Sequence, residues 1–233
     1  RNTVLMKTIT KILTSASLAA AAMTTAPLAA QVQGSVATAS VSGTLLRVPG
    51  LTTALQQVST TYAAQLQTVQ TKQTELNNLL TPYDANSNGS IDQEETAALQ
   101  SSPNFQQIQT LRAEIGVIEN QITAAQIYAV EQVLAQYQAA LTEVATAQQV
   151  VMVVDPASLQ YAAQGADISE AVGTSLAAKV PAVGIVPPAG WQPNPNSVQV
   201  FQEIQRRLVI QEARARAAQQ QQQQQNPQAP AGR

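Results

Sequence analysis

The sequence predicts an α+β fold, mostly α, in which a long antiparallel helical hairpin projects from a small β-containing body. Three observations support this: two long segments with apolar residues three or four apart, a polar turn between them, and short β-branched runs outside both. Charged residues make up only 11% of the chain and aromatic residues 3%. Such a composition favours long helices packed through small and aliphatic side chains over one compact core.

Residues 1–30 have the layout of a secretory signal peptide. Lys7 and Lys11 precede an Ala-rich apolar stretch that ends in small residues at Ala29 and Ala30. A membrane anchor is the alternative, but Thr, Ser and Pro27 interrupt the stretch, and Ala is only weakly apolar. We therefore expect export, with cleavage near Ala30.

Several function classes are excluded by composition. The chain has no Cys and no His, which rules out disulfides, thiolate chemistry and His-based catalytic or zinc sites. No Lys stands in a Ser-x-x-Lys pattern, so we expect no enzyme. Without residues 1–30, nine Lys and Arg face fourteen Asp and Glu, a net charge of −5. Because neither a basic stripe nor basic residues interleaved with aromatics occur, nucleic acid is not an expected partner.

The hairpin arm is predicted over residues 51–149. Leu55, Tyr62, Val69 and Leu76 are seven apart, the spacing of a coiled-coil or long helix-pair seam, and predict a first helix over 51–81. Ser102-Pro103 starts a second helix that continues to about Gln149. At roughly 45 residues this helix would be about 65 to 70 Å long, so it needs the first helix as an antiparallel partner.

Residues 84–95, DANSNGSIDQEE, fit the calcium-loop pattern D-x-[DN]-x-[DN]-G-x5-E. Oxygen ligands recur at alternate positions, Gly89 permits the sharp turn, and Glu95 would close the site with both oxygens. The predicted ligands are Asp84, Asn86, Asn88, the Ser90 carbonyl, Asp92 through a water, and Glu95.

The alternative for this loop is a polar turn that only reverses the chain. With three carboxylates and no second paired loop, we expect weak Ca²⁺ binding. A lone loop on an arm suits a structural clip that stiffens the reversal between the helices better than a signalling switch.

The body is predicted from residues 31–50 and 150–180. Val150–Val154 is a continuous β-branched run that predicts a buried strand, and Ser35–Val41 and Ser158–Ala162 are further candidate strands. Asp167 is placed to cap a helix over about 168–178.

This order of elements resembles the Skp/OmpH family of periplasmic chaperones. The resemblance rests on the run VVMVVDP at 150–156, the segment ending in Tyr161, and DISEAV at 167–172, and it covers roughly residues 35–180. It implies a periplasmic homotrimer whose strands form a common β body. Its helical arms would enclose a cavity that holds unfolded outer membrane proteins without ATP.

Two features depart from that family's pattern. Its members are typically basic, whereas this mature chain is mildly acidic, which leaves contact with a membrane surface or lipopolysaccharide open. The calcium-type loop is not a feature of its better-known members and suggests a subgroup.

Beyond the body, residues 181–197 read as a Pro- and Gly-rich linker that contains Trp191. Residues 198–218 predict an amphipathic helix with Val198, Phe201, Ile204 and Leu208 on one face. We expect this helix to dock on the body or on a neighbouring chain, with a membrane-surface role as the alternative. The Gln-rich segment 219–233 is expected to be disordered.

The sequence leaves two classes of function open. One is a holdase chaperone, which requires apolar surface left free for a client. The other is a calcium-stiffened coiled-coil spacer or adaptor of the cell envelope that holds no client. They are separated by how much apolar surface of the arm is buried inside the hairpin.

Overall fold

The computed structural model describes residues 34–163 and 165–225, so the predicted signal peptide lies outside the described part of the chain. The described part is mostly helical with one small sheet, which confirms the predicted fold class. The elements follow in the order β1 Ser35–Thr38, α1 Val41–Leu45, α2 Pro49–Thr61, α3 Ala63–Leu80, η1 Thr81–Tyr83, α4 Gln93–Gln100, α5 Phe105–Ala147, β2 Val150–Val154, η2 Pro156–Ser158, α6 Ser169–Lys179 and α7 Pro195–Gln225.

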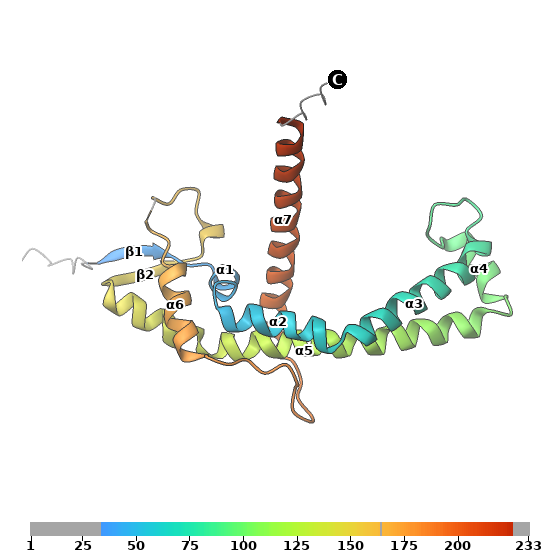
Figure 1. Ribbon diagram of the computed structural model, residues 1–233, viewed down its shortest axis with the longest axis horizontal. Helices are drawn as coiled ribbons and strands as arrows, with labels where there is room; N and C mark the ends of the chain where they lie inside the picture. Colours follow the sequence, from blue (N-terminus) through green and yellow to red (C-terminus); the bar gives the residue numbers. More distant parts are fainter. Residues whose placement is uncertain (1–33, 164, 226–233) are drawn as a thin grey trace, which may run out of the picture. The chain divides into compact units, whose positions relative to one another are not determined.

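The arm is a hairpin in which α2 and α3 run outward and α5 returns beside them (Figure 1). Its outgoing half was predicted as one helix, but the structure breaks it at Tyr62, which has φ −100° and ψ 17°. Just before the break, the hydroxyls of Ser59 and Thr60 donate to the carbonyls of Leu55 and Gln56. Such bonds can bend a helix, but they also occur at Thr68 and Thr71 inside α3, where the helix continues, so they accompany the break without accounting for it.

The apolar seam of the arm is buried along most of its length. On the outgoing side Val58, Tyr62 and Val69 are buried, and they face a longer buried stripe on α5. The buried α5 residues in the outer part of the arm are Ile108, Leu111, Ile115 and Ile122. Packing along this stripe holds the two sides of the arm together, because isolated helices are only marginally stable in water.

The sheet consists of β1 and β2 in parallel, with Val36 paired to Met152 and Thr38 to Val154. The chain turns sharply between α5 and β2 at Gln149, whose φ is +54°. The suggested strand at 158–162 does not form; Asp155 instead caps the short helix η2 by accepting from the Ala157 N–H. The N–H of Ile168 bonds to the Thr38 carbonyl, which ties the start of α6 to the end of β1.

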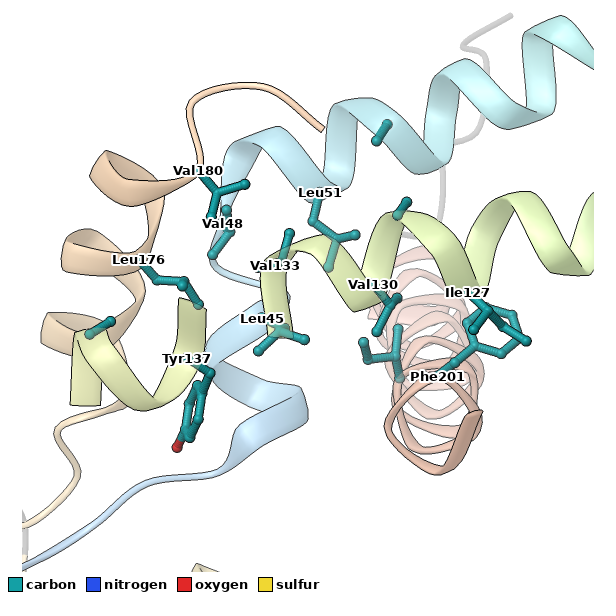
Figure 2. Close-up of a cluster of buried hydrophobic side chains, with 14 of the residues drawn as sticks. Leu45, Val48, Leu51, Ile127, Val130, Val133, Tyr137, Leu176, Val180 and Phe201 are labelled. Atoms are coloured by element: carbon teal, nitrogen blue, oxygen red, sulfur yellow. The ribbon is translucent and has the colours of Figure 1, made fainter. Parts of the chain in front are cut away.

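The core lies where the arm meets the body. Figure 2 shows side chains from α1, α2, α5 and α6 converging there. Its fully buried members include Leu45, Leu51, Val133 and Leu176. Burial of each such side chain contributes about 1.5–3 kcal/mol, so this junction is the best-stabilised part of the arm.

The C-terminal segment folds back across the middle of α5. The Gln132 side chain exchanges two hydrogen bonds with the Gly184 backbone, at 2.8 and 2.9 Å. Glu131 accepts from the Trp191 indole N–H and from the Asn194 backbone N–H. The region predicted as a linker is therefore held in place from 184 to 194.

Helix α7 is longer than the predicted 198–218. It starts at Pro195 and continues through residues 219–225, part of the segment expected to be disordered, while 226–233 lie outside the described residues. Gln is a good helix former, and extending an existing helix avoids the cost of nucleation. Phe201 and Ile204 anchor α7 in the core. Figure 2 shows Phe201 next to Ile127 of α5.

Candidate functional site

The tip loop lies between η1 and α4 at the far end of the arm (Figure 1). Its backbone adopts left-handed conformations at Ser87, with φ +56°, and at Gly89, with φ +82°. Gly accepts that conformation without strain, which is the role predicted for it at the sixth position of the loop.

The first half of the loop is organised by side-chain oxygens that accept backbone N–H groups. The Asp84 carboxylate accepts from Asn88 at 3.0 Å and from Gly89 at 2.8 Å. The side-chain carbonyl of Asn86 also accepts from the Asn88 N–H, and that of Asn88 accepts from the Ser90 N–H. These turns draw the predicted ligands of the first half toward one another.

The second half of the loop is closed by Asp92 and Glu95. Asp92 caps α4 by accepting from the N–H groups of Glu94 and Glu95, and Glu95 accepts from the Asp92 N–H, a complete capping box. Glu95 is 8% exposed and also accepts from Ala85 at 2.7 Å and Asn86 at 3.3 Å. One carboxylate thus links the start of the loop to the helix that follows it.

The donor set of the loop suits a hard cation, because it consists of carboxylate, amide and carbonyl oxygens. Among the residues that the structure describes, however, no three Asp or Glu side chains gather in a group able to hold a metal. The Glu95 oxygens are occupied by backbone N–H groups, and the Asn86 amide donates to Asp92 at 3.1 Å. Binding an ion would require these hydrogen bonds to be exchanged for metal contacts.

Apolar surface on the arm is scarce. Of the large apolar side chains described between residues 49 and 147, only Leu66, 39% exposed, and Val117, 68% exposed, count as exposed. The hairpin therefore buries most of its own apolar stripe.

The body leaves more apolar surface uncovered than the arm does. Val36 is 55% exposed and Met152 58%, and both lie in the two-stranded sheet. Tyr161 is 82% exposed in the segment after η2. Parallel sheets are normally covered on both faces, and two strands are marginal alone, so this sheet is incomplete in one chain.

Helix α7 leaves its outer half uncovered. Leu208, Val209 and Ile210 are exposed, although Leu208 was predicted on the same buried face as Phe201 and Ile204. Periodicity could not reveal this, since it marks an apolar face but not the point at which the helix leaves its partner.

The pKa of Asp167 is affected by its position just before the start of α6. Partial burial raises it, but the Ser169 hydroxyl and N–H and the charge of Arg47 outweigh that effect and leave the pKa below its ordinary value. Asp167 was predicted to cap the helix; the N-cap is instead Ile168, and Asp167 supports the helix start from one residue earlier by accepting from the Ser169 N–H at 2.9 Å.

Comparison with family models assigns residues 35–176 to the family described as outer membrane protein (OmpH-like). The match spans more than half of the chain, from β1 through the whole arm to α6. The chain belongs to the OmpH-like family. This confirms the resemblance drawn from the VVMVVDP and DISEAV runs, and it leaves most of the C-terminal segment of this OmpH-like chain outside the matched region.

Among solved structures, the OmpH-like chain is similar to a protein from Caulobacter crescentus CB15 named as a candidate outer membrane chaperone (OmpH-like). The two share 21% sequence identity with a TM-score of 0.38, and the match covers 65% of this chain and 88% of the other. Comparison with curated proteins finds no match. Within the described residues, no helix is both long and apolar enough to cross a membrane.

Proposed function

We propose that the mature protein is an ATP-independent holdase chaperone of the periplasm that keeps unfolded outer membrane proteins from aggregating. The observation that carries this proposal is the OmpH-like family match over β1, the arm, β2 and α6. The protein from Caulobacter crescentus, named as a candidate outer membrane chaperone, has the same family designation. No reaction is proposed for the chain.

The proposal includes a homotrimer. Exposed Val36, Val151 and Met152 on a two-stranded sheet support it, because further strands from other copies would cover these side chains and complete the sheet. Three arms projecting from one shared body would then surround a cavity for the client.

A client-free envelope spacer is a second candidate, and one observation favours it. The arm buries most of its own apolar stripe and exposes only Leu66 and Val117 among its large apolar side chains. A holdase of this geometry must therefore contact clients mainly through the body, α7 and the polar flanks of the arm.

We also propose that the tip loop binds Ca²⁺ weakly through Asp84, Asn86, Asn88, the Ser90 carbonyl, Asp92 and Glu95. The left-handed Gly89 and the turns that gather these oxygens support the proposal. The ion would neutralise three carboxylates and stiffen the reversal between α3 and α5.

Light scattering tests the holdase and the spacer against each other. A urea-unfolded outer membrane barrel protein is diluted into nucleotide-free buffer with the mature protein, once with Ca²⁺ and once with chelator. Suppressed aggregation at about three chains per client supports the holdase, in line with closed cyclic assembly. Unchanged scattering in both conditions would reject it in favour of the spacer.

A further inference from the structure

An open groove of about 820 Å³ lies at the base of the arm, where α7 leaves it. Its walls come from α1 and the residues just after it, from α2, from α5, and from the middle of α7. This volume is in the range of sites that bind small molecules or short peptide segments. Its lining includes Arg47, Leu55, Gln56, Gln126, Gln205 and Leu208.

The groove offers both apolar contact and hydrogen bonds. Leu55 and Leu208 supply apolar surface from opposite walls. Gln56, Gln126 and Gln205 present side-chain amides, none of which has a hydrogen-bond partner within the described part of the chain. An amide side chain can donate and accept at once, which matches the alternating N–H and C=O groups of an extended backbone.

The charge of the groove is positive. Arg47 donates from Nη1 to the Gly43 carbonyl at 2.9 Å and takes part in none of the ion pairs among the described residues. Arg207, on the α7 wall, is balanced by Glu203 at 3.3 Å. The charge of Arg47 also acts on Asp167, but Asp167 does not line the groove. No Asp or Glu lines the groove, so an anionic group that enters it would meet Arg47 without a competing carboxylate in the lining.

We propose that this groove binds an extended segment of unfolded polypeptide in which a carboxylate side chain lies close to an apolar one. The carboxylate would pair with Arg47, the apolar side chain would sit between Leu55 and Leu208, and the Gln amides would bond to the segment's backbone. The inference rests on the proposed holdase function and assigns one of its contact surfaces to α7, beyond the family-matched region.

Fluorescence anisotropy tests the groove with short, unstructured, labelled peptides added to the full mature chain. One peptide alternates Leu, Ser and Asp; matched peptides carry Asn or Lys in place of Asp. We expect the Asp peptide to bind about 10-fold more tightly than the Asn peptide, as one charge-assisted contact would give, and the Lys peptide to bind most weakly.

Two variants test the position of binding. Arg47→Gln should lower affinity for the Asp peptide by about 10-fold and leave affinity for the Asn peptide nearly unchanged. Ser59→Phe fills the groove from an exposed position of α2 and should abolish binding of both peptides. The controls are Arg206→Gln, a neighbouring α7 arginine outside the groove, and Thr60→Phe, an exposed α2 residue that does not line it.

The inference is overturned if the Asp and Lys peptides bind equally. It is also overturned if Arg206→Gln weakens binding as much as Arg47→Gln does, or Thr60→Phe as much as Ser59→Phe. It is also overturned if no peptide binds while vesicles of anionic phospholipid bind in an Arg47-dependent manner. Circular dichroism of each variant shows whether it has kept its helices.

The same preparations are then used in the aggregation assay. Aggregation suppressed without peptide binding leaves the holdase intact and rejects the groove. Peptide binding without suppression rejects the holdase and leaves a peptide-binding groove.

Discussion

Glu95 is the buried carboxylate among the described residues, and it accepts three backbone N–H groups from both ends of the tip loop. A carboxylate held in this way organises the loop before any ion arrives. The same oxygens are the predicted bidentate ligand of Ca²⁺, so one side chain would serve both the ion-free loop and the proposed calcium-bound loop.

Glu95→Gln should loosen the tip and remove its response to calcium. The substitution replaces one carboxylate oxygen by an NH₂ group, which cannot accept a hydrogen bond. A backbone N–H that bonded to that oxygen would then face another donor, which costs about 1–3 kcal/mol locally. We expect faster hydrogen exchange at the amides of Ala85 and Asp92, and no rise in melting temperature on adding Ca²⁺. The exposed neighbour variant Glu94→Gln is the control; an equal loss of protection there would contradict the assignment.

Asp167 should make the stability of the fold depend on pH in the acidic range, and this effect can be measured separately from any effect of the tip loop. Its pKa is lowered in the folded state, so its contribution to stability is complete above the unfolded value near 4 and is lost as pH falls through the folded value. The group is exposed, so this contribution should be below about 1 kcal/mol.

In urea unfolding at a series of pH values, Asp167→Asn should be less stable than the wild type at neutral pH. The difference should shrink below about pH 4 as the wild-type carboxyl becomes protonated. A difference that is the same at pH 3 and pH 7 would show that the charge of Asp167 has no part in it. Glu170→Gln, one turn further along the same helix start, is the control.

At the scale of elements, α7 is docked by its first turns and free beyond them. Phe201 and Ile204 are buried, and Glu203 and Arg207 reach Ser42 and Ser40 of α1 at 2.7 and 2.8 Å. From Leu208 onward the apolar side chains are exposed. Docking thus depends on about two turns of helix.

Ile204→Ala should destabilise the docked helix by about 2–5 kcal/mol, because a fully buried side chain is removed from the core. Ile210→Ala, in the same helix but 46% exposed, should change stability by less than about 0.5 kcal/mol. Urea unfolding followed by circular dichroism measures both. Equal effects would mean that α7 is not held at Ile204.

The helices of the arm could be predicted from the sequence because apolar periodicity is a local signal. The stripe at Tyr62, Val69, Ile108 and Ile115 is buried as expected. Val150–Val154 forms the predicted strand, but the predicted burial is wrong, because Val151 and Met152 are exposed on a sheet of only two strands. The break at Tyr62 was missed, since the apolar spacing continues through Tyr62 and does not record a local change in backbone angles.

For the tip loop, the sequence could predict which residues take part but not how they are bonded to one another. The loop pattern named six ligands in one short stretch, and the structure places Gly89 in the left-handed conformation expected of it. The hydrogen bonds that now occupy Glu95 were not foreseeable, because they depend on where α4 begins. Nor could the groove be predicted, since Arg47 and Leu208 meet only through the docking of α7.

At the scale of the whole molecule, the two-stranded sheet is the surface through which we propose that copies of the chain associate. Val36→Asp with Met152→Asp would place charges on the proposed strand interface. We expect this double variant to shift the protein from trimer toward monomer in sedimentation velocity, since burying unpaired carboxylates is strongly unfavourable.

Val186→Asp, 69% exposed and remote in sequence from the sheet, is the matched control and should sediment as the wild type. If the double variant and the wild type sediment alike, the sheet is not the surface through which copies associate.

The parallel pairing of β1 and β2 also sets the order in which the chain can fold. Ser35 pairs with Val150, so β1 cannot pair with β2 until the whole arm between them is available. Closing so long a loop unaided is entropically unfavourable and slow. If α3 and α5 zip together first from the tip, they bring the two strands side by side and shorten the search. A clip that stiffens the reversal between α3 and α5 would then act on how fast the body assembles, even where it adds little to its final stability.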